Sequence, residues 1–246
     1  TVSTPLGPKT NEDKRQYRNN NSTYGSYKPN KLTIFRRGAP HLSKEEIRIR
    51  VWRLMEEKGV ATFPKPIIHR IPNFVGAEKA AQNLRSLSEY KAAEVVFCNP
   101  DSPQRPIREM ALRDGKTVVM ATPKLKQGFL LLDSKTIPSN RISEASTIRG
   151  AFKHGHFIEP NKVKVDLFIA GSVAVSQDGG RLGKGTGYSD QEYSILKNAG
   201  SLTTQTTIVT TVHDIQIVEK IPKEEWDVSV DIIVTPTRII RTVRLH

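Results

Sequence analysis

The sequence contains one cysteine, Cys98, among its 246 residues. A single thiol excludes an intramolecular disulfide framework and a cysteine-based zinc site, which favours a reducing compartment over secretion. No apolar run reaches the length of about 20 residues that spans a bilayer, and no secretory signal is visible. The sequence starts at Thr1 and not at Met, which either a cleaved organellar leader or a shortened sequence would explain. We therefore predict a mitochondrion, a plastid or the cytoplasm as the compartment.

Acidic residues are scarce. The sequence has 25 Asp and Glu against 38 Lys and Arg, a net charge of +13, so anionic partners are expected. Residues 1–42 carry eight Lys and Arg, two acids and no hydrophobic periodicity. We predict a basic arm there, disordered by itself because it has too little apolar surface to offset the entropy of ordering, or docked on a large partner such as RNA or another protein.

Hydrophobic periodicity predicts one folded domain at 43–240 and a basic tail at 241–246. Ser43 and Glu46 form a capping box before the apolar stripe of a helix at 43–59. Further helices are predicted at 77–90, 103–113, 139–152 and 189–199, and strands at 94–98, 117–121, 163–175 (bent at Gly171), 207–212, 215–219 and 228–234. This alternation predicts an α/β fold, a three-layer open and mostly parallel sheet with helices on both faces.

A glycine-rich loop lies between the strand at 163–175 and the helix at 189–199, which Ser189 and Glu192 are expected to cap. Its sequence from 179 to 193 is GGRLGKGTGYSDQEY, with two cations between the glycines. Successive backbone N–H groups and a helix N-terminus bind anions, so a phosphate is the expected ligand. The spacing matches neither the Walker nor the dinucleotide pattern. An ordinary hairpin with exposed charges is the alternative.

The run VDLFIAGSVAVSQDGGRLGKGTGYSDQEY resembles the signature of the 5-formyltetrahydrofolate cyclo-ligase (methenyltetrahydrofolate synthetase) family. Lys44 and Arg48 match that family's basic pair on its first helix, and IPKEEWDVSVDIIVT matches its downstream motif. The resemblance covers about 43–240. The stretches FPKPIIHRIPNFVGA, TPKL, AGSVAVS and DIIVTPTRII are similar to the family's domain-containing branch. Animal members of that branch also carry an RNA-recognition domain, which we do not find in this sequence.

The resemblance implies an ATP- and Mg²⁺-dependent ligase that phosphorylates the formyl oxygen of a formyl-folate and closes it to methenyl-folate. It implies a phosphate-binding loop, a set of catalytic cations, substrate contacts and one acidic residue that binds Mg²⁺ or orients the loop. The phosphate-binding set comprises Gly180, Gly183, Gly185 and Gly187 with Lys44, Arg48 and Lys184. The catalytic cations are Lys44, Arg48, Arg181 and Lys184, the substrate contact is Tyr188, and the acidic residue is Asp190. From the residues themselves we add two candidate substrate contacts: His69, whose proline-bounded loop either lines a pocket or is an ordinary turn, and Trp226, near the expected rim of the site.

Two departures from the family pattern predict weakened activity. Ser189 replaces the second tyrosine of the GYYD motif, and Ala170 or Gly171 replaces a proline. The alternative hypothesis is therefore a non-catalytic subunit with the same fold, recruited to RNA or to a ribonucleoprotein such as an organellar ribosome. The basic arm and the arginines at 238, 241 and 244 would make that contact, and its affinity would depend strongly on salt.

Overall fold

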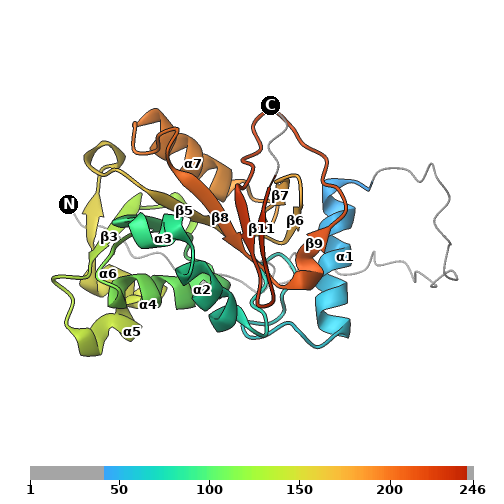
Figure 1. The fold of residues 1–246 in the computed structure, drawn as a ribbon, viewed down its shortest axis with the longest axis horizontal. Helices are drawn as coiled ribbons and strands as arrows, with labels where there is room; N and C mark the ends of the chain where they lie inside the picture. The colour runs from blue at the N-terminus through green and yellow to red at the C-terminus, as the bar shows by residue number, and fades with distance from the viewer. Residues whose placement is uncertain (1–41, 243–246) are drawn as a thin grey trace, which may run out of the picture. The chain divides into compact units, whose positions relative to one another are not determined.

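The computed structural model describes residues 42–242, shown in colour in Figure 1. The predicted arm at 1–42, apart from its last residue, and residues 243–246 of the predicted tail lie outside this range. No described helix has the length and apolar character needed to cross a membrane. The capping box is confirmed, because α1 (Lys44–Glu57) starts after Ser43, whose side chain accepts from the Glu46 N–H while Glu46 accepts from the Ser43 N–H.

An eight-stranded sheet forms the centre of the domain, in the order β11-β10-β8-β5-β1-β2-β3-β4. The strands β10, β8, β5, β1 and β2 run parallel, and β11, β3 and β4 pair antiparallel at the two edges. The mostly parallel sheet is therefore confirmed. The strands span Val95–Cys98 (β1), Thr117–Ala121 (β2), Phe129–Asp133 (β3), His156–Ile158 (β4), Leu167–Ala170 (β5), Thr207–Thr211 (β8), Ile232–Val234 (β10) and Ile239–Arg241 (β11).

Helices cover both faces of this sheet (Figure 1). Because side chains alternate along a strand, Val96 and Cys98 pack on one face and Phe97 on the other. The first face is covered by α2 (Ala77–Arg85), α4 (Arg105–Arg113), α5 (Ile142–Ala145) and α6 (Ile148–His154). On the second face, Leu196 of α7 (Tyr188–Asn198) packs in the cluster around Phe97. The predicted three layers are confirmed.

A smaller sheet carries the glycine-rich loop. It pairs β6 (Ala174–Ser176) with β7 (Arg181–Leu182) antiparallel and with β9 (Ile217–Val218) parallel. Val51 and Trp52 of α1 share a buried cluster with Ala174 and Leu182 of this sheet. The hydrophobic stripe of α1 therefore holds the first helix against the strands from which the loop leaves.

Several boundaries differ from the prediction. The helix predicted at 77–90 ends at Arg85 and resumes as α3 (Ser88–Ala92), and the one at 139–152 is divided into a 3₁₀ turn, α5 and α6. The strand predicted at 163–175 breaks at Gly171, so that β5 and β6 belong to different sheets. The edge strands β3, β4 and β11 were not predicted. Their pairing partners are supplied by the tertiary fold, and a short apolar run alone does not distinguish a strand from a helix.

Candidate functional site

The chain order of the parallel strands changes direction between β1 and β5. From β1 the chain moves outward to β2 and then returns to the other side of β1 to form β5. Open α/β sheets bind ligands at such a switch point, beyond the carboxyl ends of the strands. A cavity of about 520 Å³ lies there, which we call the switch-point cavity. Its lining includes Asn99, Asp101, Gly171, Lys184, Tyr188 and Glu192.

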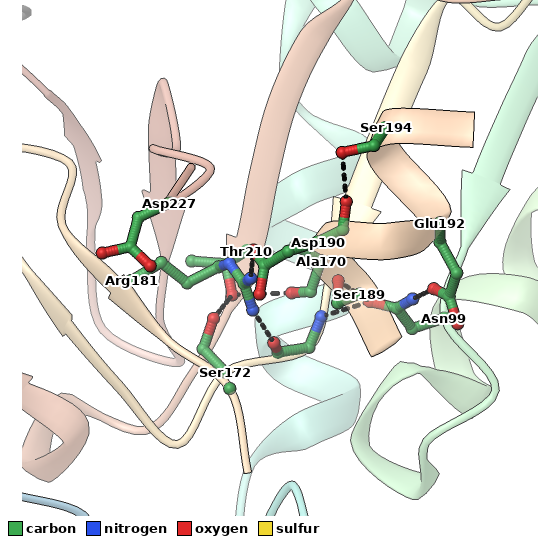
Figure 2. A network of polar contacts seen from close by, with 12 residues as sticks. Asn99, Ala170, Ser172, Arg181, Ser189, Asp190, Glu192, Ser194, Thr210 and Asp227 are labelled. Carbon is green, nitrogen blue, oxygen red and sulfur yellow. Dashed lines mark hydrogen bonds and ion pairs between the residues drawn. The ribbon is translucent and has the colours of Figure 1, made fainter. Parts of the chain in front are cut away.

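Asn99, directly after β1, organises the floor of the switch-point cavity. Its side-chain oxygen accepts from the Gly171 N–H at 2.8 Å and from the Ser189 hydroxyl at 3.2 Å. Its amide nitrogen donates to the carboxyl group of Glu192, as Figure 2 shows. Asn99 and Glu192 are both buried. This network joins the ends of β1 and β5 to the first turns of α7.

Burial raises the pKa of Glu192 from 4.5 to about 8. The neighbouring Asp101 raises this pKa further, while Lys184, Arg181 and the hydrogen bond from Asn99 lower it. Desolvation of the charged form is the largest of these effects. Glu192 is therefore mostly protonated at neutral pH and can both donate and accept hydrogen bonds.

The raised pKa makes the stability of the domain depend on pH. Between about pH 4.5 and 8 the folded state keeps the Glu192 proton that the unfolded state releases, so stability falls as the pH rises, by up to about 1.4 kcal/mol per pH unit. Glu192→Gln removes this slope. We expect the stability of the variant relative to wild type to increase between pH 5.5 and pH 8 in urea unfolding. Parallel pH profiles of the two proteins would contradict the expectation.

Arg181 lies beneath the glycine-rich loop, with its side chain only 2% exposed. Its guanidinium donates to the Gly171 carbonyl at 3.0 Å and to the Asp190 carboxylate in the first turn of α7 (Figure 2). Gly180 is buried as well, and a Cβ atom there would lie 2.5 Å from the Ser176 hydroxyl oxygen. Both predicted site residues are therefore buried beneath the loop, where Arg181 connects Gly171 to Asp190.

A second cavity, of about 680 Å³, lies on the α1 side of the loop, and we call it the helix-side cavity. Lys44 and Arg48 line it together, as their spacing on one helix face predicts. The Lys44 ammonium lies 2.6 Å from the carboxylates of both Glu224 and Asp227. The Arg48 Nε donates to the Gly183 carbonyl at 2.8 Å. The first helix is thereby tied to the glycine-rich loop.

The two cavities adjoin along the glycine-rich loop, since Gly183, Gly187 and Asp190 line both. The predicted cations consequently lie on two sides of it. Lys44 and Arg48 line the helix-side cavity, whereas Lys184 lines the switch-point cavity, 3.1 Å from the Asp101 carboxylate.

The remaining predicted residues also divide between the two cavities. His69 and Tyr188 line the switch-point cavity. Gly185 lines the helix-side cavity, and so does Trp226, which is 70% exposed. Asp190 lines both cavities.

The predicted cap of α7 is wrong. Gly187 is the N-cap residue, with a φ of 70°, and no side chain caps the helix. The left-handed conformation at this position favours glycine. Ser189 lies inside the helix and bonds Asn99, and Glu192 is buried next to it. The prediction confused two cavity residues with a capping pair.

Two of the three arginines predicted to contact RNA are paired with acids of the domain. Arg238 donates to Asp214 at 3.0 Å, and Arg241 donates to both carboxylate oxygens of Glu89. These ion pairs would have to open, or be shared, for the two arginines to contact RNA. Arg244 lies outside the described residues.

Asn99, Asp101 and Glu192 were missed as site residues. The dipeptide Asn99–Pro100 followed by Asp101 directly after a buried strand was an available signal, because polar residues at the carboxyl end of a parallel strand lie where ligands bind. For Glu192, the pattern Ser-x-x-Glu pointed to a cap. Only the packing of α7 on β1 shows that the carboxyl group is buried.

A cavity at the switch point of a parallel sheet, bordered by a basic glycine-rich loop, is the arrangement by which open α/β domains bind anionic small molecules. Residues 41–236 match the model of the 5-formyltetrahydrofolate cyclo-ligase family, and the chain belongs to that family. A solved structure of 5,10-methenyltetrahydrofolate synthetase from Aquifex aeolicus has the same fold, with a TM-score of 0.52 and 22% identity over 80% of this chain and 92% of that one.

Sequence relatives agree with this assignment. Methenyltetrahydrofolate synthase domain-containing proteins of Bos taurus and Homo sapiens are 41% and 40% identical over 209 residues, which are 82% of this chain and 54% of each relative. The chain thus matches about half the length of these relatives. The 5-formyltetrahydrofolate cyclo-ligase of Escherichia coli K12 is 40% identical over 76 residues, which are 31% of this chain and 39% of that protein.

Proposed function

We propose that the chain is an ATP-dependent ligase that closes 5-formyltetrahydrofolate to the methenyl form. The observation that carries the proposal is the position of the glycine-rich loop, with a cation-lined cavity on each side. Transfer of a phosphoryl group from one substrate to another requires two adjoining sites. A glycine-rich loop allows both substrates to approach the loop backbone closely.

The helix-side cavity would hold the nucleotide phosphates. Loop N–H groups, Lys44 and Arg48 supply the positive charge there. Lys44 is paired with Glu224 and Asp227, so a phosphate oxygen would take the place of a carboxylate oxygen on this ammonium group. Trp226 lines the same cavity and adds an exposed aromatic surface to it.

The switch-point cavity would hold the folate-type substrate. Its formyl oxygen takes the phosphoryl group of ATP, the second folate nitrogen attacks the formyl carbon and loses its proton, and the phosphate leaves with the formyl oxygen. Lys184 lines this cavity from the loop and would neutralise charge on the transferred and leaving phosphate. His69 and Tyr188 would contact the substrate.

Magnesium bound to the nucleotide would neutralise further phosphate charge. No cluster of three His, Cys, Asp or Glu side chains suited to a metal occurs within residues 42–242, so the phosphates would supply most of its ligands. Glu224 and Asp227 line the helix-side cavity and fit that role as oxygen donors. The contact between Asp190 and Arg181 supports the loop-orienting role for Asp190.

The proposed function is tested by incubating the purified chain with 5-formyltetrahydrofolate, ATP and Mg²⁺ and following the methenyl product by its absorbance. We expect product formation that requires ATP. Because Ser189 replaces the usual tyrosine, the rate is expected to be low. A folded chain that binds ATP and forms no product would contradict the proposed activity.

Arg48→Ala is expected to weaken nucleotide binding about 10-fold or more, because it removes a charged donor from the helix-side cavity and releases Gly183. Arg50→Ala is the matched control, since Arg50 is exposed on the same helix and lines neither cavity. Isothermal titration calorimetry with ATP measures both. Equal affinities of the two variants for ATP would show that Arg48 does not contribute to the nucleotide site.

A further inference from the structure

The floor of the switch-point cavity has carboxyl oxygens that the protein does not use. One oxygen of Glu192 is bonded to Asn99, and within residues 42–242 no hydrogen bond reaches the other. The residue is only 4% exposed and lines the cavity. Because the residue lines the cavity, a ligand there can hydrogen bond to this free oxygen without breaking a bond within the protein.

Two more polar groups lie beside Gly171, and of these Asp101 lines the cavity. A Cβ atom at Gly171 would lie 3.1 Å from Asp101 Oδ2 and 3.1 Å from Gln104 Oε1. Asp101 uses its other oxygen, Oδ1, for Lys184. The side-chain amide of Gln104 is buried, and neither of its polar atoms has a partner within the described residues. The floor therefore presents carboxyl oxygens of Glu192 and Asp101, and the buried Gln104 amide lies beside Gly171.

The mouth of the cavity carries positively charged side chains. Arg70 and Lys124 line it and are both exposed, so their charges lie near solvent. Acceptors at the floor and cations at the mouth favour a ligand with an uncharged, donor-rich head and an anionic tail. A folate-type molecule has both parts, an amino-pyrimidinone ring at one end and carboxylates at the other.

We propose that Glu192 determines the specificity of the switch-point cavity by hydrogen bonding the amino-pyrimidinone edge of a folate-type ligand through the carboxyl oxygen that Asn99 leaves free. Asp101 lies beside that edge, and the carboxylate tail extends toward Arg70 and Lys124. This inference rests on the proposed function. It also assigns the ring to the floor of the cavity and adds a residue that sequence reasoning did not place in the site.

The experiment compares two ligands by isothermal titration calorimetry on the full chain. The first is 5-formyltetrahydrofolate, and the second is p-aminobenzoylglutamate, which has the tail without the ring. Glu192→Met keeps the length of the side chain and removes its polar oxygens, whereas Glu192→Gln keeps hydrogen-bonding groups. Thermal unfolding of each variant and its affinity for ATP, measured at the helix-side cavity, report on the integrity of the fold.

We expect Glu192→Met to weaken binding of 5-formyltetrahydrofolate about 10-fold or more, because it leaves the ring edge unpaired at a buried site. Binding of p-aminobenzoylglutamate should be unchanged, and Glu192→Gln should keep most of the affinity for both ligands. Arg70→Ala with Lys124→Ala should weaken both ligands.

Three results would overturn the inference. Wild-type affinity for 5-formyltetrahydrofolate in Glu192→Met would do so, as would equal losses for both ligands in that variant. If Glu192→Met does not fold, a 10-fold loss of affinity for 5-formyltetrahydrofolate in a folded Glu192→Gln variant would also overturn the inference. These results leave the proposed function standing. Failure of the wild-type chain to bind either ligand, while ATP still binds, would overturn the folate assignment and the inference together.

Discussion

Replacing Lys184 with alanine is expected to lower the rate of methenyl product formation ~100-fold or more, the typical effect of removing one preorganised group that stabilises developing charge. Lys184 is the loop cation on the substrate side, and its ammonium lies 3.1 Å from the Asp101 carboxylate. The fold should tolerate the change, because the Lys184 side chain is 31% exposed and exposed ion pairs contribute about 0–1 kcal/mol.

The matched control for Lys184→Ala is Lys153→Ala. Lys153 also forms one ion pair, with Glu144 at 2.8 Å, and it lines neither cavity. Both variants lose one cation and one ion pair, so a general effect of charge on binding or solubility would change both. Single-turnover rates with saturating ATP separate the chemical step from binding. Similar rates for the two variants would show that Lys184 does not take part in the reaction.

Arg181→Met should destabilise the domain by about 3–5 kcal/mol, the range measured when one partner of a buried ion pair is removed. The Arg181 side chain connects the Gly171 carbonyl at the end of β5 to Asp190 in α7. Its loss leaves a carbonyl and a carboxylate without their donor beneath the loop. A decrease of about 10 °C in Tm is expected for a chain of this size, measured by differential scanning calorimetry.

Arg85→Met provides the comparison for this change. Arg85 donates to both carboxylate oxygens of Asp114, but its side chain is 53% exposed, so its removal should cost less than about 1 kcal/mol. Equal stability losses at the two sites would contradict the positioning role. An Arg181→Met variant with unchanged Tm and weakened ATP binding would show that Arg181 binds phosphate, as the sequence predicts.

The sequence predicts the fold well where local signals agree with tertiary packing. The cap at Ser43 and the buried stripe of α1 locate the first helix, and the apolar runs of β1 and β2 locate two central strands. The edge strand β3 was missed because its pairing with β2 is a tertiary interaction. Gly171 was expected to bend one strand, and in the structure it separates strands of two sheets.

The site was predicted less completely, for a physical reason. Spacing on a helix places Lys44 and Arg48 together, and glycine spacing locates the loop, but neither says on which side of the loop a cation lies. Lys184 is on the opposite side from Arg48, and Arg181 is inside the protein. Glu192 acquires its role from its burial against Asn99, which the sequence of α7 alone does not show.

The most direct test of the account follows the formyl oxygen. 5-Formyltetrahydrofolate labelled with ¹⁸O in its formyl group is converted by the chain with ATP and Mg²⁺, and the released phosphate is analysed by mass spectrometry. Transfer of the phosphoryl group to the formyl oxygen predicts one ¹⁸O atom in each phosphate, formed in equal amount to the methenyl product. Unlabelled phosphate would show that ATP is hydrolysed by water without contact between the substrates of the two cavities, and it would contradict the central claim.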